Sequence, residues 1–450
     1  MTLRLWNLPD IVSFDHDLQV SPSSECSLCR LLSSGLSSRQ VNVPERINKI
    51  RFEELGQTET LSGYPTASIC IAPCGKNGQR LVPYGRDTFR FGARRYTYGR
   101  MVQPNHASRD LVHQWLERCK HEHRGVCSDT PTASTGHDSA PEYVIDVQEM
   151  RIHHVGLEKL DYLALSYVWG SVPTLQLLKG NRLELVKPGS LSDRFDELPA
   201  VVRDAVSFTK DIDYKFLWVD TLCICQDDAE TKERQIAGMN TVYDRATMTL
   251  VALEGHDASY GLSGVRPYET PRFQHVENAH QLRMMTLMPN ISESLERSVW
   301  RTRAWTFQEE QFSRRILFFT KYQMYFRCQI STYCEDRFED CLKVHVGGYL
   351  DGSFQNGLLR RSVPDVYLSA TASRIWMRMV EDYSKRSFGR ESDRYDAFAG
   401  IESQLKQDNF QYPCILGMPI KHLVRELYWH HLEVPNDANR KARRIASYSS

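Results

Sequence analysis

The sequence lacks an excess of charge of either sign, because Lys+Arg and Asp+Glu both total 56. This balance argues against the basic surface that binding to nucleic acid or to an anionic membrane requires. No apolar run approaches the roughly 18 residues that cross a bilayer. The N-terminal MTLRLWNLPDIVSFDHD reaches acidic residues too early for a signal peptide. We therefore expect a cytoplasmic protein, with a nuclear location left open, that binds no nucleic acid and has no membrane span.

Several enzyme motifs are also missing. The chain contains no G-x-G-x-x-G, Walker or G-x-S-x-G run, which argues against an ordinary α/β metabolic enzyme. Of its 450 residues 41% are hydrophobic and 25% are charged, as in a soluble globular protein of two or three domains.

The chain divides into three regions by pattern. Residues 1–140 are rich in turn residues and end in the linker-like SDTPTASTGHDSAP, which predicts an irregular N-terminal subdomain that contains Cys and His. Residues 141–330 carry regular patterns and form the predicted main domain. Residues 331–450 predict a loop-rich and then mainly helical C-terminal extension.

The main domain alternates predicted strands and helices. Strands are predicted at 161–167, 215–225 and 248–253, and amphipathic helices at 197–212 and 227–246. The run KFLWVDTLCIC (215–225) is apolar on both faces, as a central parallel strand is. RILFF and QMYFRC predict a further strand pair. This order predicts an α/β fold in which helices flank both faces of a parallel sheet of four or five strands.

Several separate pieces resemble one family, the fungal heterokaryon incompatibility (HET) domain. They are LALSYVWG, LPAVVRDAV, FLWVDTLCICQDD, MNTVYDRATMTLVAL and RAWTFQEEQFSRRILFF, and their order and spacing also match. The resemblance implies non-self recognition that leads to programmed cell death, through an incompatibility partner protein or self-association. HET domains are also distantly similar to Toll/interleukin-1 receptor (TIR) domains, some of which cleave NAD.

Polar residues follow the predicted strands at the edge where parallel α/β sheets bind ligands. Tyr167 and Trp169 follow the first strand, and Asp220 and Gln226 lie at the end of the second. We expect them to meet Arg303, Trp305 and Gln308 in one cofactor-binding site that raises the pKa of a carboxylate. The alternative for Asp220 is a structural role, in which it caps the next element or accepts backbone N–H bonds.

Glu309 is the candidate catalytic residue. The run W-T-F-Q-E (305–309) resembles the W-C-x-x-E-L run of TIR proteins, whose Glu serves N-glycosidic cleavage of NAD. Here Thr306 replaces the cysteine and Glu310-Gln311 replaces the leucine. A carboxylate suits this chemistry because it can stabilise an oxocarbenium-like centre. The alternative is a surface ion-pair network of Arg303, Glu309 and Arg314.

The cysteines indicate a possible structural zinc site. Cys26 and Cys29 have metal-knuckle spacing, and Cys119, His121, His123 and Cys127 follow later in the chain. We predict that Cys26, Cys29, His123 and Cys127 are the ligands, with Cys119 as an alternative ligand. The other possibility is a set of reduced, packed thiols. Cys223 and Cys225 are interpreted as core residues on opposite faces of a strand.

Overall fold

The computed structural model describes chiefly residues 99–124, 141–266, 274–279, 282–338 and 379–388. It also describes residues 127 and 272, the strands of the first hundred residues, and a few shorter pieces. The chain divides into two compact units. The first is Met1–Ser362 with Lys385–Gly400, and the second is Val363–Ser384 with Ile401–Ser450. The first unit contains both candidate sites.

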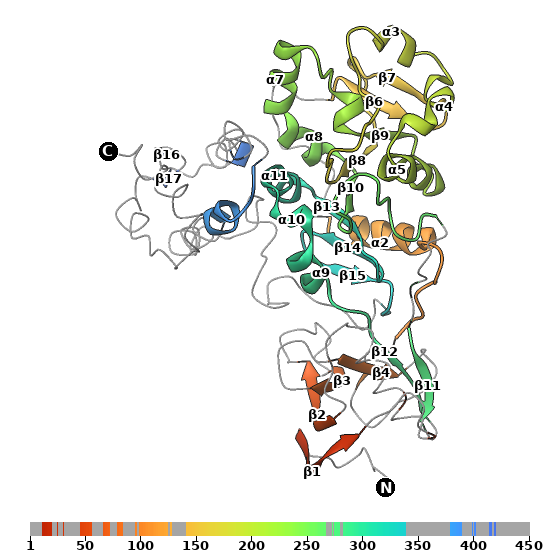
Figure 1. The fold of residues 1–450 in the computed structure, drawn as a ribbon, viewed down its shortest axis with the longest axis vertical. Coiled ribbons are helices and arrows are strands. Elements are labelled where there is room, and N and C mark those ends of the chain that lie inside the picture. The colour runs from red at the N-terminus through yellow and green to blue at the C-terminus, as the bar shows by residue number, and fades with distance from the viewer. Residues whose placement is uncertain are drawn as a thin grey trace. The chain divides into compact units, whose positions relative to one another are not determined.

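An eight-stranded sheet lies at the centre of the first unit (Figure 1). Its four central strands are parallel neighbours in the order β13, β10, β8, β9. Antiparallel strands β14 and β15 extend one edge, and β6 and β7 extend the other. In chain order the bounds are β6 Tyr143–Asp146, β7 Arg151–His154, β8 Tyr162–Ser166, β9 Phe216–Trp218, β10 Met248–Ala252, β13 Arg315–Phe319, β14 Met324–Cys328 and β15 Thr332–Cys334. The predicted α/β fold is confirmed, with a mixed sheet whose core is parallel.

Helices connect and flank these strands. Helix α5 (Ala200–Asp211) joins β8 to β9 and buries Val201, Val202 and Ala205, as its helical spacing predicts. Pro199 is its N-cap residue. Three helices of the unit, α2 (Arg109–Glu122), α8 (Met239–Arg245) and α11 (Ala304–Phe312), carry residues of the candidate sites. Further helical segments are α3 Arg182–Leu185, α4 Ser190–Asp193, η2 Phe195–Glu197, α9 Ile291–Arg297 and α10 Val299–Thr302.

Two predicted elements differ from the structure. The strand predicted at 215–225 ends at Trp218, and a helical turn, α6 (Asp220–Cys223), follows it. The Cys223 thiol accepts a hydrogen bond from Val219 N (3.3 Å) across this turn. Cys223 and Cys225 are both buried as predicted, but they do not alternate on a strand. The helix predicted at 227–246 is two helices, α7 (Ala229–Ala237) and α8, which meet at Gly238.

The region before residue 140 contains strands where the sequence predicts irregular structure. Strands β1 (Ile11–Gln19), β2 (Arg46–Leu55), β3 (Thr66–Ala72) and β4 (Gln79–Pro83) pair antiparallel in series. Strand β4 then pairs with β12 (Leu282–Thr286), which pairs with β11 (Val276–Ala279), and β5 (Arg95–Tyr96) pairs with β3. Strands β11 and β12 come from far along the chain, so local pattern alone does not reveal that they complete this sheet.

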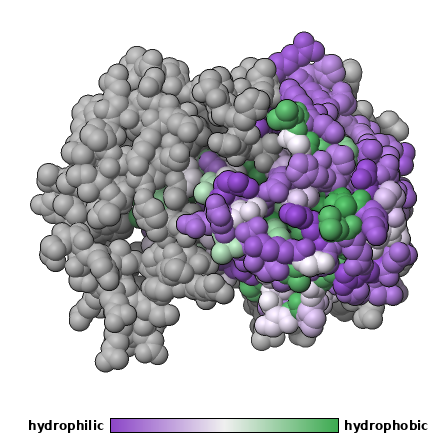
Figure 2. Space-filling model, turned by 90° about the horizontal axis from the view of Figure 1, so that it is seen from above, coloured by the Kyte–Doolittle hydropathy of each residue, from purple (hydrophilic) through white to green (hydrophobic). Residues whose placement is uncertain are grey.

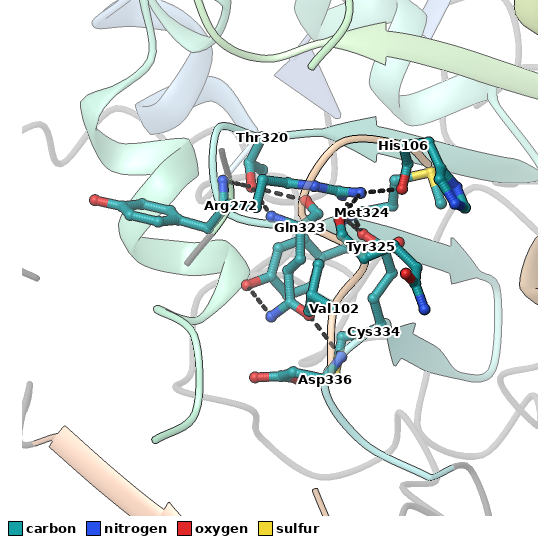
Figure 3. A network of polar contacts seen from close by, with 12 residues as sticks. Val102, His106, Arg272, Thr320, Gln323, Met324, Tyr325, Cys334 and Asp336 are labelled. Carbon is teal, nitrogen blue, oxygen red and sulfur yellow. Dashed lines mark hydrogen bonds and ion pairs between the residues drawn. The ribbon is translucent and has the colours of Figure 1, made fainter. Parts of the chain in front are cut away.

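A buried polar network ties the segment around residues 102–106 to β14 and β15 (Figure 3). Arg272 pairs with Glu335 (2.5 Å) and donates to Gln103 O (2.8 Å) and His106 O. Glu335 also accepts from Met324 N (2.6 Å). Because buried charges are stable only when paired and hydrogen-bonded, this network holds four segments in fixed register.

Seen from above, the described surface is mostly hydrophilic, and hydrophobic residues form small separate groups (Figure 2). Within the described residues, no helix has the length and apolar character needed to cross a membrane.

In the second unit, residues 379–384 are helical as predicted, and β16 (Cys414–Ile415) pairs with β17 (Met418–Pro419). Most of the other predicted C-terminal helical residues lie outside the described residues.

Candidate functional site

Glu309 lies on α11 and is buried against the end of β8, only 7% exposed. Its carboxylate accepts a hydrogen bond from the Ser166 hydroxyl, and that hydroxyl accepts one from the indole of Trp300 (2.7 Å). Tyr243 on α8 lies near enough to lower the pKa of Glu309, and its hydroxyl donates to Leu165 O (3.2 Å) at the end of β8. Four segments that are distant in sequence therefore enclose this carboxylate. The expectation that Glu309 forms surface ion pairs is wrong, because the carboxylate is buried and Arg314 pairs with Asp244 (3.0 Å).

Asp220 lies where the chain leaves β9 and begins the α6 turn. Its side chain accepts from the Trp169 indole (2.7 Å) and from Thr221 N (2.7 Å), and the Tyr167 hydroxyl lies 3.2 Å from that of Thr221. The bond from Thr221 N is the structural role considered for Asp220. The bond from Trp169 joins Asp220 to the segment that follows β8, as predicted, and Tyr167 lies near enough to lower the pKa of Asp220. Asp220, Glu309 and their direct hydrogen-bond donors are called the carboxylate centre below.

Burial determines the charge state of both acids. The pKa of Glu309 is raised from 4.5 to about 7, first by burial and also by the nearby charge of Asp220, while the Ser166 bond and Arg303 oppose the rise. Burial likewise raises the pKa of Asp220 from 3.8 to about 6, against the bonds from Trp169 and Thr221. Both acids therefore gain or lose a proton near neutral pH. Carboxylates poised in this way are typical of catalytic and ligand-binding sites.

The predicted site residues are only partly brought together. Tyr167, Trp169, Asp220 and Glu309 meet, and the positive charge of Arg303 lies near enough to lower the pKa of both acids. Gln226 instead donates to Asp220 O and Ile224 O (both 3.0 Å) and so braces the α6 loop. Gln308 is buried beside Gly400, where an added Cβ would meet its amide. Trp305 is half-buried on α11.

A second cluster is formed by Cys119, His123, Cys127 and Cys328, all buried. Each offers one ligand atom, and the four atoms lie within 4.8 Å of one another. Cys119 is on α2, His123 is its C-cap residue, and Cys328 ends β14. A tetrahedral zinc ion with Zn–S bonds of about 2.3 Å holds its sulfurs roughly 3.8 Å apart. The buried Cys3His cluster can therefore hold a metal ion, and its donor set is compatible with zinc.

Hydrogen bonds around the cluster favour bound thiolates. The Cys328 sulfur accepts from Ser331 N (3.3 Å) and Ile330 N (3.5 Å). His123 Nδ1 lies 3.3 Å from that sulfur, and His123 Nε2 lies 3.4 Å from the Ser331 hydroxyl. One imidazole nitrogen is thus free to ligate while the other is oriented by a hydroxyl, as in metal sites generally. Backbone N–H groups that point at sulfur stabilise its negative charge.

Residues 162–309 match the family described as heterokaryon incompatibility protein (HET). This part of the chain is a HET domain. No curated protein and no solved structure matches it. The match begins at β8 and ends at Glu309, so the HET domain contains both acids of the carboxylate centre. All four residues of the Cys3His cluster lie outside it, three before and one after.

Some site residues were missed from the sequence. Tyr243 and Trp300 complete the surroundings of Glu309 beside Ser166, and apolar neighbours in sequence made both look like core packing. Cys328 belongs to the cluster although the sequence did not indicate it, and the predicted ligands Cys26 and Cys29 lie outside the described residues. The four-residue spacing of Cys119, His123 and Cys127 was the available signal, because it brings ligands to one side of a helix end. Nothing in the sequence around Cys328 marks it as a ligand.

Proposed function

We propose that this HET-domain protein is an effector of heterokaryon incompatibility, which triggers programmed cell death, and that the carboxylate centre carries the effector function. The supporting observation is the burial of two acids together at the carboxyl ends of parallel strands, with the pKa of each raised towards neutrality. Such an arrangement destabilises the fold, and proteins retain features of this kind at functional sites. The effector works in the cytoplasm and is engaged by an incompatibility partner or by its own copies.

The test is expression in a fungal cell whose death is scored. Glu309→Gln keeps the shape and the bond from Ser166 but removes the ionisable group, so we expect killing to be lost. Glu310→Gln is the matched control on the next residue, because Glu310 faces Arg327 (2.7 Å) and Arg386 (3.6 Å) and not the centre. Full killing by a normally expressed Glu309→Gln protein would contradict the proposal and leave the domain as an interaction module.

A second candidate for the effector step is hydrolysis of NAD to nicotinamide and ADP-ribose, with water adding to the ribose carbon as the N-glycosidic bond breaks. The observation that favours it is the pKa of about 7 for Glu309, since an acid that is partly ionised at neutral pH can orient the ribose or stabilise an oxocarbenium-like centre. Arg303 lies near enough to lower the pKa of both acids, and its positive charge attracts the anionic pyrophosphate of NAD. Purified protein incubated with NAD should release nicotinamide, and Glu309→Gln should not. Absence of release by the wild-type protein would leave binding as the effector step.

We also propose that the Cys3His cluster binds one structural zinc ion through Cys119, His123, Cys127 and Cys328. The donor set and the N–H bonds to sulfur support this assignment. Metal analysis of the purified chain should give about one equivalent of zinc. Less than about a tenth of an equivalent, with folding unchanged in chelator, would remove the zinc proposal.

A further inference from the structure

Arg315 is one of the most deeply buried charged residues among the described residues, at 1% exposure. It is the first residue of β13, and the antiparallel register of β13 and β14 places it directly opposite Cys328. Its position is therefore set by the same strand pair that presents the fourth residue of the Cys3His cluster. A buried guanidinium requires hydrogen-bond acceptors and compensating negative charge.

All three guanidinium nitrogens of Arg315 donate hydrogen bonds. Nε donates to the Cys119 sulfur (3.3 Å), and one terminal nitrogen donates to Cys127 O (2.5 Å). The other terminal nitrogen donates to Thr247 O (3.1 Å), just before β10. One side chain thus reaches two cluster residues of the α2 segment while it is anchored in the sheet.

The net charge of a zinc-loaded cluster explains why a guanidinium lies beside it. Three thiolates and a neutral imidazole around a divalent cation leave one net negative charge, which is costly in a buried site. The adjacent guanidinium carries one positive charge and can cancel it. Outer hydrogen bonds of this kind also orient ligands, and their loss typically weakens metal binding by about 10- to 100-fold.

We propose that Arg315 is the outer-sphere partner of the Cys3His metal centre: it neutralises the zinc–thiolate charge and fixes Cys119 and the Cys127 backbone against the sheet. The inference rests on the proposed zinc site and adds a positioning residue to it. Arg315 is not a ligand. It joins the segment that precedes the HET domain to strands β10 and β13, so the metal and the arginine together fasten that segment to the core.

The test compares purified full-length variants. Arg315→Met removes charge and hydrogen bonds, whereas Arg315→Lys keeps the charge but loses the forked contact with Cys119 and Cys127. Arg314→Met is the matched control, because Arg314 is the adjacent buried arginine and pairs with Asp244 (3.0 Å). Zinc affinity is measured by competition with a chromophoric chelator. The sulfur-to-cobalt charge-transfer band is recorded after cobalt replaces zinc.

We expect Arg315→Met to bind zinc about 10- to 100-fold more weakly than the wild type, with Arg315→Lys intermediate and Arg314→Met within about threefold. Both Arg315 variants should shift the cobalt band, which loss of fold stability alone does not do. If Arg315→Met does not fold, the band and affinity of Arg315→Lys decide. Wild-type affinity and an unshifted band in the Arg315 variants would overturn the role of Arg315 alone. Absence of zinc from the wild-type protein would overturn the metal centre itself.

Discussion

Replacement of Glu309 by Gln should make the protein more stable at pH 8 but not at pH 5. In the folded protein burial first of all raises the pKa of Glu309 from 4.5 to about 7. As pH rises from about 4.5, the unfolded chain releases this proton while the folded chain keeps it. The folded state therefore loses stability until pH passes about 7. Glutamine keeps the neutral shape and has no proton to release.

The size of the effect follows from the two pKa values. The interval from 4.5 to about 7, at about 1.4 kcal/mol for each pH unit, corresponds to roughly 3 kcal/mol. For a domain of this size that free energy is a melting-temperature difference of roughly 5 to 10 °C. We expect Glu309→Gln to melt above the wild type by this amount at pH 8 and within about 1 °C of it at pH 5, measured by calorimetry or dye-binding scans.

The neighbouring residue supplies a control of opposite sign. Burial would raise the pKa of Glu310, but the charges of Arg327, Arg386 and Arg301 outweigh it and lower that pKa below 4.5. Its ionised form therefore contributes stability that is fully present above pH 4.5 and is lost as pH falls through the lowered pKa. Glu310→Gln should melt below the wild type at pH 8. If both variants move in the same direction at pH 8, the electrostatic account of the centre is wrong.

Three further predictions test the surroundings. Cys328→Ser should lose zinc and lower the melting temperature by at least about 5 °C, whereas Cys223→Ser, a buried thiol outside the cluster, should retain zinc; equal zinc content in the two would exclude Cys328 as a ligand. Gly170→Ala should destabilise the protein by more than about 1 kcal/mol in denaturant unfolding, because Gly170 has φ +66° and its missing Cβ would collide with Asp257. A Cβ added at Gly180 meets nothing within 4 Å, so Gly180→Ala should change the free energy of unfolding by less than half of the Gly170→Ala effect. A Gly170→Ala protein as stable as Gly180→Ala would refute the packing argument. Arg303→Met should raise the pKa of both acids further and so steepen the fall in melting temperature between pH 5 and pH 8, and an unchanged slope would place Arg303 away from the centre.

The fold was largely predictable because the parallel core leaves a regular trace in the sequence. Strand β10 and helix α5 carry patterns that neighbouring residues do not interrupt, and both were predicted close to their observed bounds. The error at Cys223 has a local cause. An apolar run reads equally well as strand or buried helical turn, and the side chain of Asp220, which accepts from Thr221 N, favours the turn. Strands β1–β4 were missed although they pair in series, because turn residues dominate the pattern of that region.

The candidate sites were predictable only in part. Asp220 and Glu309 could be identified because polar residues at the ends of predicted strands and in a recognisable motif stand out. Trp300 and Tyr243 could not, because an aromatic residue that lies against a polar centre looks in sequence like any core residue. Cys328 depends on an encounter between α2 and β14, and spacing along the chain carries no information about such an encounter.

The surroundings of the two sites have opposite effects on the charged state of their side chains, and this difference distinguishes their roles. Around the Cys3His cluster, backbone N–H groups and Arg315 point at sulfur, so the surroundings favour the charged, metal-binding state. Around Glu309, burial and Asp220 disfavour the charged state. The presence of this buried acid therefore lowers the stability of the fold. Changes at the cluster should therefore reduce stability and killing together. Changes at Glu309 should remove killing while stability rises, a combination that a residue with only a structural role does not produce.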